Sequence, residues 1–300
     1  MRHRKFGTVV CVSVILLLGS CSWPVREAKE VSSEPITAIL GAFEREITLL
    51  EDQLTDTQEQ RIEGMRFVSG KLDGKRVVIA WTGIGKVNAA MTATLLIEHF
   101  KPSELFFTGI AGGINPQLWP GDIVIAAEIA HHDMGVLTPQ SFDYRGAMNP
   151  LDGWRNPVFL PADERLLELA QRAAGQLELE TIRTTAGERL PRIIKGIVVT
   201  GDVFVASPEK CAELRQQLGA DAVEMEGAAV AQICYQRRIP HLVIRSISDK
   251  ADEGAVLDKQ LFQMVAAKNS ASLVAEIISL LDSEDRGQKT EDRAPNVSEG

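Results

Sequence analysis

The stretch VVIAWTGIGKVNAA, residues 77–90, decides the fold class of this chain. It opens with a β-branched apolar run that is typical of a buried strand. The turn TGIGK follows, and from residue 86 to residue 100 apolar residues recur at three- and four-residue steps, which predicts a helix. A strand that leads through a short turn into a helix is the building unit of α/β proteins with parallel strands.

The same alternation continues along the chain. Further apolar runs predict strands at 36–40, 105–108, 123–127, 197–200 and 241–247. Helical patterns lie at 43–54, 163–176, 225–237 and 260–281. We therefore expect a single α/β domain over residues 35–282, with a mostly parallel mixed sheet flanked by helices. The proline-rich segment 138–162 predicts a long surface loop.

Composition excludes several classes of protein. The 300 residues are 45% hydrophobic and 24% charged, as in globular chains. Acidic residues number 41 against 32 basic ones, and the net charge of −9 disfavours nucleic acid as a partner, because such binding depends on Lys and Arg. The 4 cysteines are irregularly spaced, which argues against a disulfide scaffold and against a CxxC zinc site.

The N-terminus has the pattern of an export signal. Basic residues at positions 2, 4 and 5 precede an apolar run over 6–18, which is shorter than the ~20 residues of a membrane span. The closing residues LGSC, 18–21, resemble the lipobox of bacterial lipoproteins, in which the cysteine becomes the lipidated first residue. The resemblance implies a signal peptide over 1–20, a lipid anchor on Cys21 and, because Ser22 follows, the periplasmic face of the outer membrane. A plain cleaved signal or an N-terminal anchor is the alternative.

Segments at both ends of the domain have no helical or strand periodicity. Residues 21–34 predict a tether between the anchor and the domain. Residues 283–300 are polar and charged, and predict a disordered tail.

Acidic residues follow several of the expected strands. In α/β sheets the ligand lies beyond the carboxyl ends of the strands, so we expect Glu46, Glu224, Glu226 and Asp249 to converge on one rim, beside the glycines of TGIAGG at 108–113. Each acid also has a plainer interpretation. Glu46 could stabilise a helix dipole, Asp249 could cap a helix, and one of the two glutamates could lie on the surface.

Histidine and aspartate at 131–133 invite comparison with a metal site. Adjacent residues of a strand point to opposite faces, so the ligands would have to converge from elsewhere. We expect no metal and no cofactor.

The motifs together resemble the 5'-methylthioadenosine/S-adenosylhomocysteine nucleosidases of the purine nucleoside phosphorylase superfamily. The resemblance runs from about residue 36 to residue 281. Its blocks are GAFEREI at 41–47, TGIGKVNAA at 82–90, TGIAGG at 108–113, GDVF at 201–204, VEMEGAAVA at 223–231 and VIRSISDKAD at 243–252.

The resemblance implies cleavage of an N-glycosidic bond and assigns the chemistry to three residues. Asp249 would protonate the purine at N7, which requires a carboxyl with a raised pKa. Glu46 would orient or deprotonate the attacking water, and Arg245 would orient the acids and the water. Cleavage leaves an electron-poor ribosyl carbon and a purine that gains negative charge, so both an acid and a carboxylate are needed.

The resemblance also implies a set of substrate-binding residues: Glu226 on the ribose hydroxyls, Met225 under the ribose, Phe204 stacked on the purine, Val205 reading the purine edge, Ser248 holding Asp249, and Phe43 at the mouth that takes the 5' group. It further implies a homodimer whose partner lends residues to the 5' pocket.

Three positions depart from the family pattern. Phe107 stands where the phosphorylases carry an arginine, which favours water over phosphate. Ile110 replaces the serine that the nucleosidases carry near the water. Lys259 stands where the family carries a phenylalanine that covers the sugar or the 5' group. Phe262 is the nearest phenylalanine in this chain that could replace it.

Two rival functions stay open at this point. One is a phosphorylase or a futalosine-type nucleosidase of the same superfamily. The other is a non-catalytic nucleoside-binding lipoprotein, which the acids disfavour because a buried acid is costly for a receptor.

The export pattern gives a first prediction. Metabolic labelling with a fatty acid should mark the wild-type protein in membrane fractions, and Cys21→Ala should abolish the label because no thiol remains to be acylated. Equal labelling of both proteins would contradict the lipoprotein interpretation, whereas an unlabelled soluble wild type would indicate a plain cleaved signal.

Overall fold

The computed structural model describes residues 34–291 apart from 180, 185–186 and 252–254, and leaves aside the side chains of 183, 184, 187, 255–262 and 284–291. The predicted signal peptide, Cys21 and nearly all of the predicted tether lie outside the described residues. The described part forms one compact unit.

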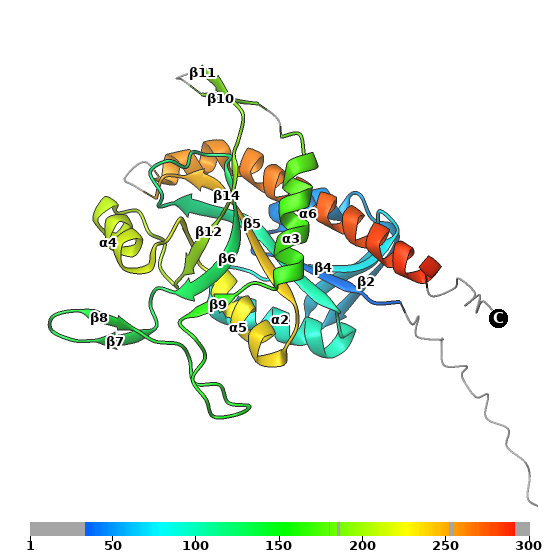
Figure 1. Cartoon of the computed structure of the whole chain (residues 1–300), viewed down its shortest axis with the longest axis horizontal. Coiled ribbons are helices and arrows are strands. Elements are labelled where there is room, and N and C mark those ends of the chain that lie inside the picture. The colour runs from blue at the N-terminus through cyan, green and yellow to red at the C-terminus, as the bar shows by residue number, and fades with distance from the viewer. Residues whose placement is uncertain (1–33, 180, 185–186, 252–254, 292–300) are drawn as a thin grey trace, which may run out of the picture. The chain divides into compact units, whose positions relative to one another are not determined.

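A 10-stranded mixed sheet forms the centre of this unit (Figure 1). The strand order is β13-β12-β6-β14-β5-β1-β4-β3-β2, with β9 paired to β6. The strands are β1 (Thr37–Gly41), β2 (Thr55–Ile62), β3 (Met65–Leu72), β4 (Lys75–Trp81), β5 (Glu104–Gly113), β6 (Ile123–His131), β9 (Phe159–Pro161), β12 (Ile193–Thr200), β13 (Ala222–Glu224) and β14 (His241–Asp249). The expected α/β class is confirmed.

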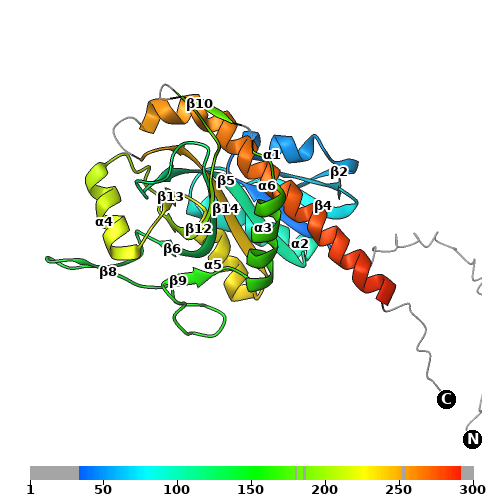
Figure 2. The same cartoon turned by 45° about the horizontal axis from the view of Figure 1, so that its top comes forward.

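Helices cover both faces of the sheet (Figure 2). They are α1 (Glu44–Glu51), α2 (Lys86–Phe100), α3 (Glu164–Gln176), α4 (Pro208–Leu218), α5 (Gly227–Arg237) and α6 (Ala255–Glu291). Alternate residues of each strand enter opposite cores: Leu105 and Phe107 pack with α2 and α5, whereas Phe106 packs with α1, α3 and α6. This alternation is the two-residue period of a strand buried on both faces.

The strand β13 closes part of the sheet on itself. It pairs parallel with β12 and antiparallel with β5, so that β5, β14, β6, β12 and β13 form a ring of pairings. Because β6 runs antiparallel to β14, the strands β12 and β13 reach the site from the direction opposite to β5. The acids converge as expected, but Glu224 ends a strand that runs opposite to β5 and β14, and Glu226 follows that strand.

Two hairpins on the outer half of the sheet escaped the sequence analysis. The strand β2 is exposed along almost its whole length and carries no apolar pattern. Its turn to β3 has Glu63 and Gly64 at positive φ, and the turn from β3 to β4 has Asp73 and Gly74 at positive φ. An Asp-Gly pair is a strong hairpin signal and could have revealed the second turn.

The segment TGIAGG, 108–113, is part of β5 and not a turn after it. Residues 138–162, expected as a loop, include β8 (Phe142–Tyr144), which pairs with β7 (Gly135–Leu137), and β9. A further small pair joins β10 (Ile182–Thr184) to β11 (Gly187–Arg189).

The last helix, α6, extends to Glu291, so the helix continues into the segment predicted to be disordered from residue 283. Once a helix is nucleated, its extension through Glu, Arg, Gln and Lys is inexpensive. Within α6 the stretch Gln263–Ser283 is long and apolar enough to span a membrane, but 56% of its apolar window is buried, as in a core helix. It packs on β14 and β5 and against α1 and α3.

Candidate active site

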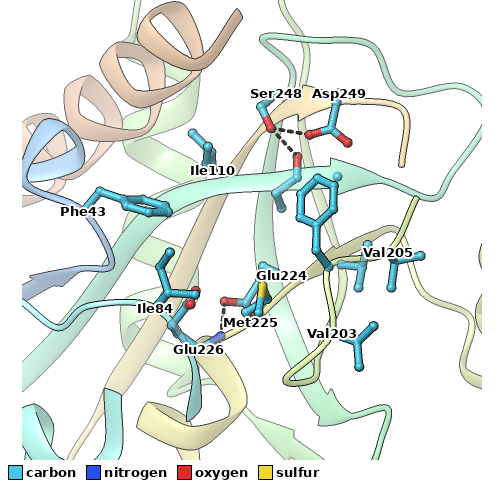
Figure 3. A pocket seen from close by; sticks show the side chains of 14 residues that line it. Phe43, Ile84, Ile110, Val203, Val205, Glu224, Met225, Glu226, Ser248 and Asp249 are labelled. Atoms are coloured by element: carbon cyan, nitrogen blue, oxygen red, sulfur yellow. Dashed lines mark hydrogen bonds between the residues drawn. The ribbon is translucent and has the colours of Figure 1, made fainter. Parts of the chain in front are cut away.

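A cavity of about 340 Å³ opens where β5, β13 and β14 meet (Figure 3). It is lined by Phe43, Ile84, Ile110, Ala111, Gly112, Val203, Phe204, Val205, Val223, Glu224, Met225, Glu226, Ser248 and Asp249. The wall is mostly apolar, with carboxylates entering at separate points. This is the usual make-up of a site for a small organic ligand.

The carboxylate of Glu46 lies behind this wall. Its Oε2 accepts hydrogen bonds from the N–H groups of Ala42 (2.6 Å) and Phe43 (3.0 Å), and its Oε1 accepts one from Ile110 N–H (2.9 Å). The residue is 1% exposed. Burial raises the pKa of Glu46, while Arg245 and the backbone donors act to lower it. Glu46 thus caps α1, as in the plainer interpretation, but it is buried and interacts with Arg245, so it is not a solvated capping residue.

A glycine makes this arrangement possible. A Cβ on Gly109 would lie 2.2 Å from Arg245 Nη1 and 2.6 Å from Glu46 Oε1, both far inside contact distance. The guanidinium and the carboxylate therefore pack directly against the backbone of β5, and any side chain at residue 109 would displace them. Ser270 of α6 supports the same strand, since its Oγ accepts a hydrogen bond from Gly109 N–H (3.1 Å) and pairs with Thr108 Oγ1. Sequence analysis did not identify Ser270.

Arg245 is fixed by a buried ion pair with Glu224. Its Nη2 lies 2.6 Å from Glu224 Oε2, with the two side chains 1% and 2% exposed. Its Nη1 donates to Thr108 O (2.8 Å), and the guanidinium stacks 4.2 Å above the ring centroid of Phe107. Arg245 Nε finds no acceptor within the described residues.

Glu224 is the site residue that sequence reasoning most undervalued. Beyond Arg245, its Oε2 accepts the N–H groups of Glu226 (2.9 Å) and Gly227 (2.7 Å), and its Oε1 accepts the hydroxyl of Thr200. Both glutamates of VEME are buried, so the alternative in which one of them lies on the surface is wrong. The pattern of two acids two residues apart cannot say which acid pairs with which cation.

Glu226 is positioned by the glycine turn that opens α2. Its Oε1 accepts Gly85 N–H at 2.7 Å, and Gly85 has φ of 93°, a left-handed region that favours glycine. Burial, followed by the charge of Glu224, raises the pKa of Glu226 to about 7. The protonated form of this carboxyl is therefore more favoured than that of a solvent-exposed glutamate.

Asp249 ends β14 and enters the cavity from the side opposite Glu226 (Figure 3). Ser248 Oγ donates to its Oδ2 (2.7 Å), and Ala251 N–H donates to its Oδ1 (2.9 Å). The plainer interpretation as a local turn cap is thus partly true, because the Ala251 contact is of that kind. The raised pKa expected for Asp249 stays a prediction.

The expected binding residues also lie around this cavity. Phe43, Met225, Phe204, Val205 and Ser248 all line it. Phe204 is 42% exposed. The roles assigned to these residues stay predictions, whereas their gathering at one cavity is a finding.

Within the sequence HHD at 131–133, Asp133 holds a loop in place next to the site. Asp133 binds Lys86 Nζ (2.6 Å) and Asp202 N–H (2.9 Å), and Asp202 in turn accepts Lys86 N–H (2.8 Å). These contacts tie the loop before Phe204 to the start of α2. Within the described residues no group of His, Cys, Asp and Glu is arranged to hold a metal ion.

The structure describes the side chains at two of the three positions that depart from the family pattern. Phe107 is fully buried beneath Arg245, and Ile110, 7% exposed, lines the cavity. Lys259 and Phe262 fall in the part of α6 whose side chains lie outside the description.

Comparison with known proteins agrees with this geometry. Residues 36–279 match the family model described as the phosphorylase superfamily, so the chain belongs to that superfamily. A nucleosidase for 5'-methylthioadenosine and S-adenosylhomocysteine from Psychromonas ingrahamii is 39% identical over 246 residues, which cover 81% of this chain and 98% of that protein. The chain belongs to this nucleosidase family.

Solved structures show the same relationship. The Neisseria meningitidis 5'-methylthioadenosine/S-adenosylhomocysteine nucleosidase, in complex with methylthio-immucillin-A, has a TM-score of 0.70 and 37% identity over 81% of this chain and 98% of its own. The futalosine hydrolase of Helicobacter pylori has a TM-score of 0.68 and 30% identity, and the match covers 81% of this chain and 97% of the hydrolase.

The buried ion pair gives a stability prediction. Glu224→Gln keeps the shape of the side chain but leaves Arg245 charged and unpaired, so the free energy of unfolding should fall by about 3–5 kcal/mol. Urea denaturation measures this quantity. The matched control is Glu213→Gln, which breaks the half-exposed pair with Lys210 (side chains 36% and 39% exposed) and should cost less than about 1 kcal/mol. Equal losses in the two variants would contradict the assigned importance of the pair.

Proposed function

We propose that this chain hydrolyses the N-glycosidic bond of adenine nucleosides that carry a 5' substituent, such as methylthioadenosine or S-adenosylhomocysteine, to adenine and a ribose-type sugar. The observation that carries the proposal is the cavity that has Asp249 and Glu226 at opposite sides and Glu46 and Arg245 behind its wall. The family relationship and the inhibitor complex of the Neisseria relative support it.

The proposed reaction separates charge across the cavity. Asp249 gives a proton to N7 of the purine, which neutralises the negative charge of the departing base. Phe204 and Val205, which line the cavity, provide an apolar bed for the purine. Glu226 binds the ribose hydroxyls near the start of α2. Glu46 takes a proton from the attacking water, and Arg245 orients it.

Water is the proposed nucleophile in preference to phosphate. Among the described residues that line the cavity there is no Lys or Arg. Arg245 is already bound to Glu224 and to a carbonyl, Phe107 lies beneath its guanidinium, and Ile110 presents apolar atoms to the cavity. A doubly charged phosphate would lack partners there, and burying an unpaired charge costs several kcal/mol.

The proposed acid role has a direct test. Asp249→Asn keeps the size of the side chain but cannot supply a carboxyl proton, so turnover of methylthioadenosine should fall by about 10²–10⁴ while binding of an adenine nucleoside largely survives. Adenine release and equilibrium binding measure the two effects. The control Asp143→Asn changes an exposed aspartate and should be neutral. Near-normal turnover in Asp249→Asn would remove the residue from the mechanism, and an equal loss of binding would make its role structural.

The choice of nucleophile has a second test. Adenine should be released at the same rate with and without phosphate, and the second product should be the free sugar. A sugar 1-phosphate, or a rate that rises in proportion to added phosphate, would reassign the chain as a phosphorylase. Parallel assays with futalosine test the second candidate substrate. This candidate is supported by the similarity to the futalosine hydrolase of Helicobacter pylori. Binding without any turnover would support a receptor.

We also propose that the chain forms a homodimer that covers the cavity mouth. Val87 (78% exposed) and Met91 (49%) lie one turn apart on α2, and Trp81 (44%) precedes them. Ile84, which lines the cavity, is also exposed just before this helix, and Phe204, a second lining residue, is exposed as well. An apolar surface of this kind, continuous with the mouth of a site, is suited to a second copy of the chain.

The proposed dimer can be tested by light scattering. Val87→Glu places a charge in the apolar surface and should shift the protein towards monomer. The control Leu190→Glu alters an apolar residue of similar exposure (67%), in the segment between β11 and β12, and should leave the mass unchanged. A monomeric wild type, or a dimer in both variants, would contradict the proposed interface.

We further propose that the mature protein is an exported lipoprotein, anchored through Cys21 to the periplasmic face of a membrane, with the outer membrane as its destination. The sequence pattern at residues 1–22 supports this placement, and the labelling experiment with Cys21→Ala tests it.

A further inference from the structure

The cavity wall in front of Glu46 has an unusual construction. Phe43 and Ile110, two of the residues whose backbone N–H groups hold the Glu46 carboxylate, also present their side chains to the cavity. Glu46 itself is 1% exposed and is not part of the lining. The residues that hold this carboxylate are therefore also part of the apolar cavity wall.

Of these two side chains, Ile110 is the more tightly confined. It is 7% exposed, whereas Phe43 is half-buried and lies at the start of α1. The backbone N–H of Ile110 donates to Glu46 Oε1 (2.9 Å), and its side chain packs with Ala266 and Ala267 of α6 while also lining the cavity. The Ile110 side chain therefore belongs to the part of the cavity wall that adjoins the Glu46 carboxylate.

We propose that Ile110 is a specificity-determining residue for the nucleophile: its side chain limits the space beside Glu46 and Arg245 to one water molecule and excludes larger alcohols. This inference rests on the proposed hydrolysis. An apolar wall discriminates by size, and a single methyl or methylene group is worth about 10–200-fold in such a site.

Methanol is a suitable probe because its reaction balances in the same way as that of water. The C1'–N9 bond breaks with its electron pair going to adenine, and Asp249 supplies the proton to N7. The oxygen of methanol forms the new bond to C1', and its hydroxyl proton goes to Glu46. The products are adenine and the methyl glycoside of the sugar, in place of adenine and the free sugar.

The experiment measures the ratio of methyl glycoside to free sugar when the full-length protein cleaves methylthioadenosine in dilute methanol. Wild type should incorporate methanol well below its share in the solvent. Ile110→Ala removes most of the side chain and should raise the ratio by about tenfold, with Ile110→Val intermediate. The matched control is Ile84→Ala, which shortens an isoleucine beside Glu226, away from Ile110 (Figure 3), and should leave the ratio at the wild-type value.

The outcomes separate this inference from the proposed function. Failure of the wild type to release adenine would refute the proposed hydrolysis. Adenine release with a product ratio that is the same in wild type, Ile110→Val and Ile110→Ala would overturn the role of Ile110 alone, as would an equal rise in Ile84→Ala. If Ile110→Ala does not fold, the comparison of Ile110→Val with wild type decides, and an unchanged ratio there overturns the inference.

Discussion

The buried ion pair between Arg245 and Glu224 is the interaction on which the site depends. It joins β14 to β13 across the ring of strands, and Arg245 also binds a carbonyl of β5. A buried charge without a partner is strongly destabilising, so the two strands cannot separate without exposing or stranding both charges. Because Glu224 also accepts the N–H groups that begin α5, the same pair fixes the start of that helix and the position of Glu226.

Close packing against glycine backbone lets the charged groups share so small a volume. At Gly109 the backbone is in contact with both Glu46 and Arg245, and at Gly85 a positive φ directs an N–H group at Glu226. Glycine in a strand is normally a weak point, since it adds no packing. Here it removes the Cβ that would otherwise occupy the place of the acids.

The carboxylates differ in environment, and so they can differ in chemistry. Glu224 is paired with Arg245, and Glu46 is bound by several backbone N–H groups. Burial and the nearby charge of Glu224 raise the pKa of Glu226, which has one such donor, to about 7. Asp249 stands apart from them, beside the hydroxyl of Ser248. A reaction that needs an acid on one side of the substrate and a base on the other is served by such a division.

The sequence by itself determined the fold class, because period-two and period-3.6 patterns report burial directly, and it determined the family, because motifs such as TGIGKVNAA and VEMEGAAVA are local. It also named most of the residues that gather at the cavity. It could not show that β13 runs opposite to β5, that Glu224 pairs with Arg245 or that Ser270 supports Gly109. Those contacts join residues far apart in the chain, and their geometry arises only when the strands close into a ring. No local pattern encodes that closure.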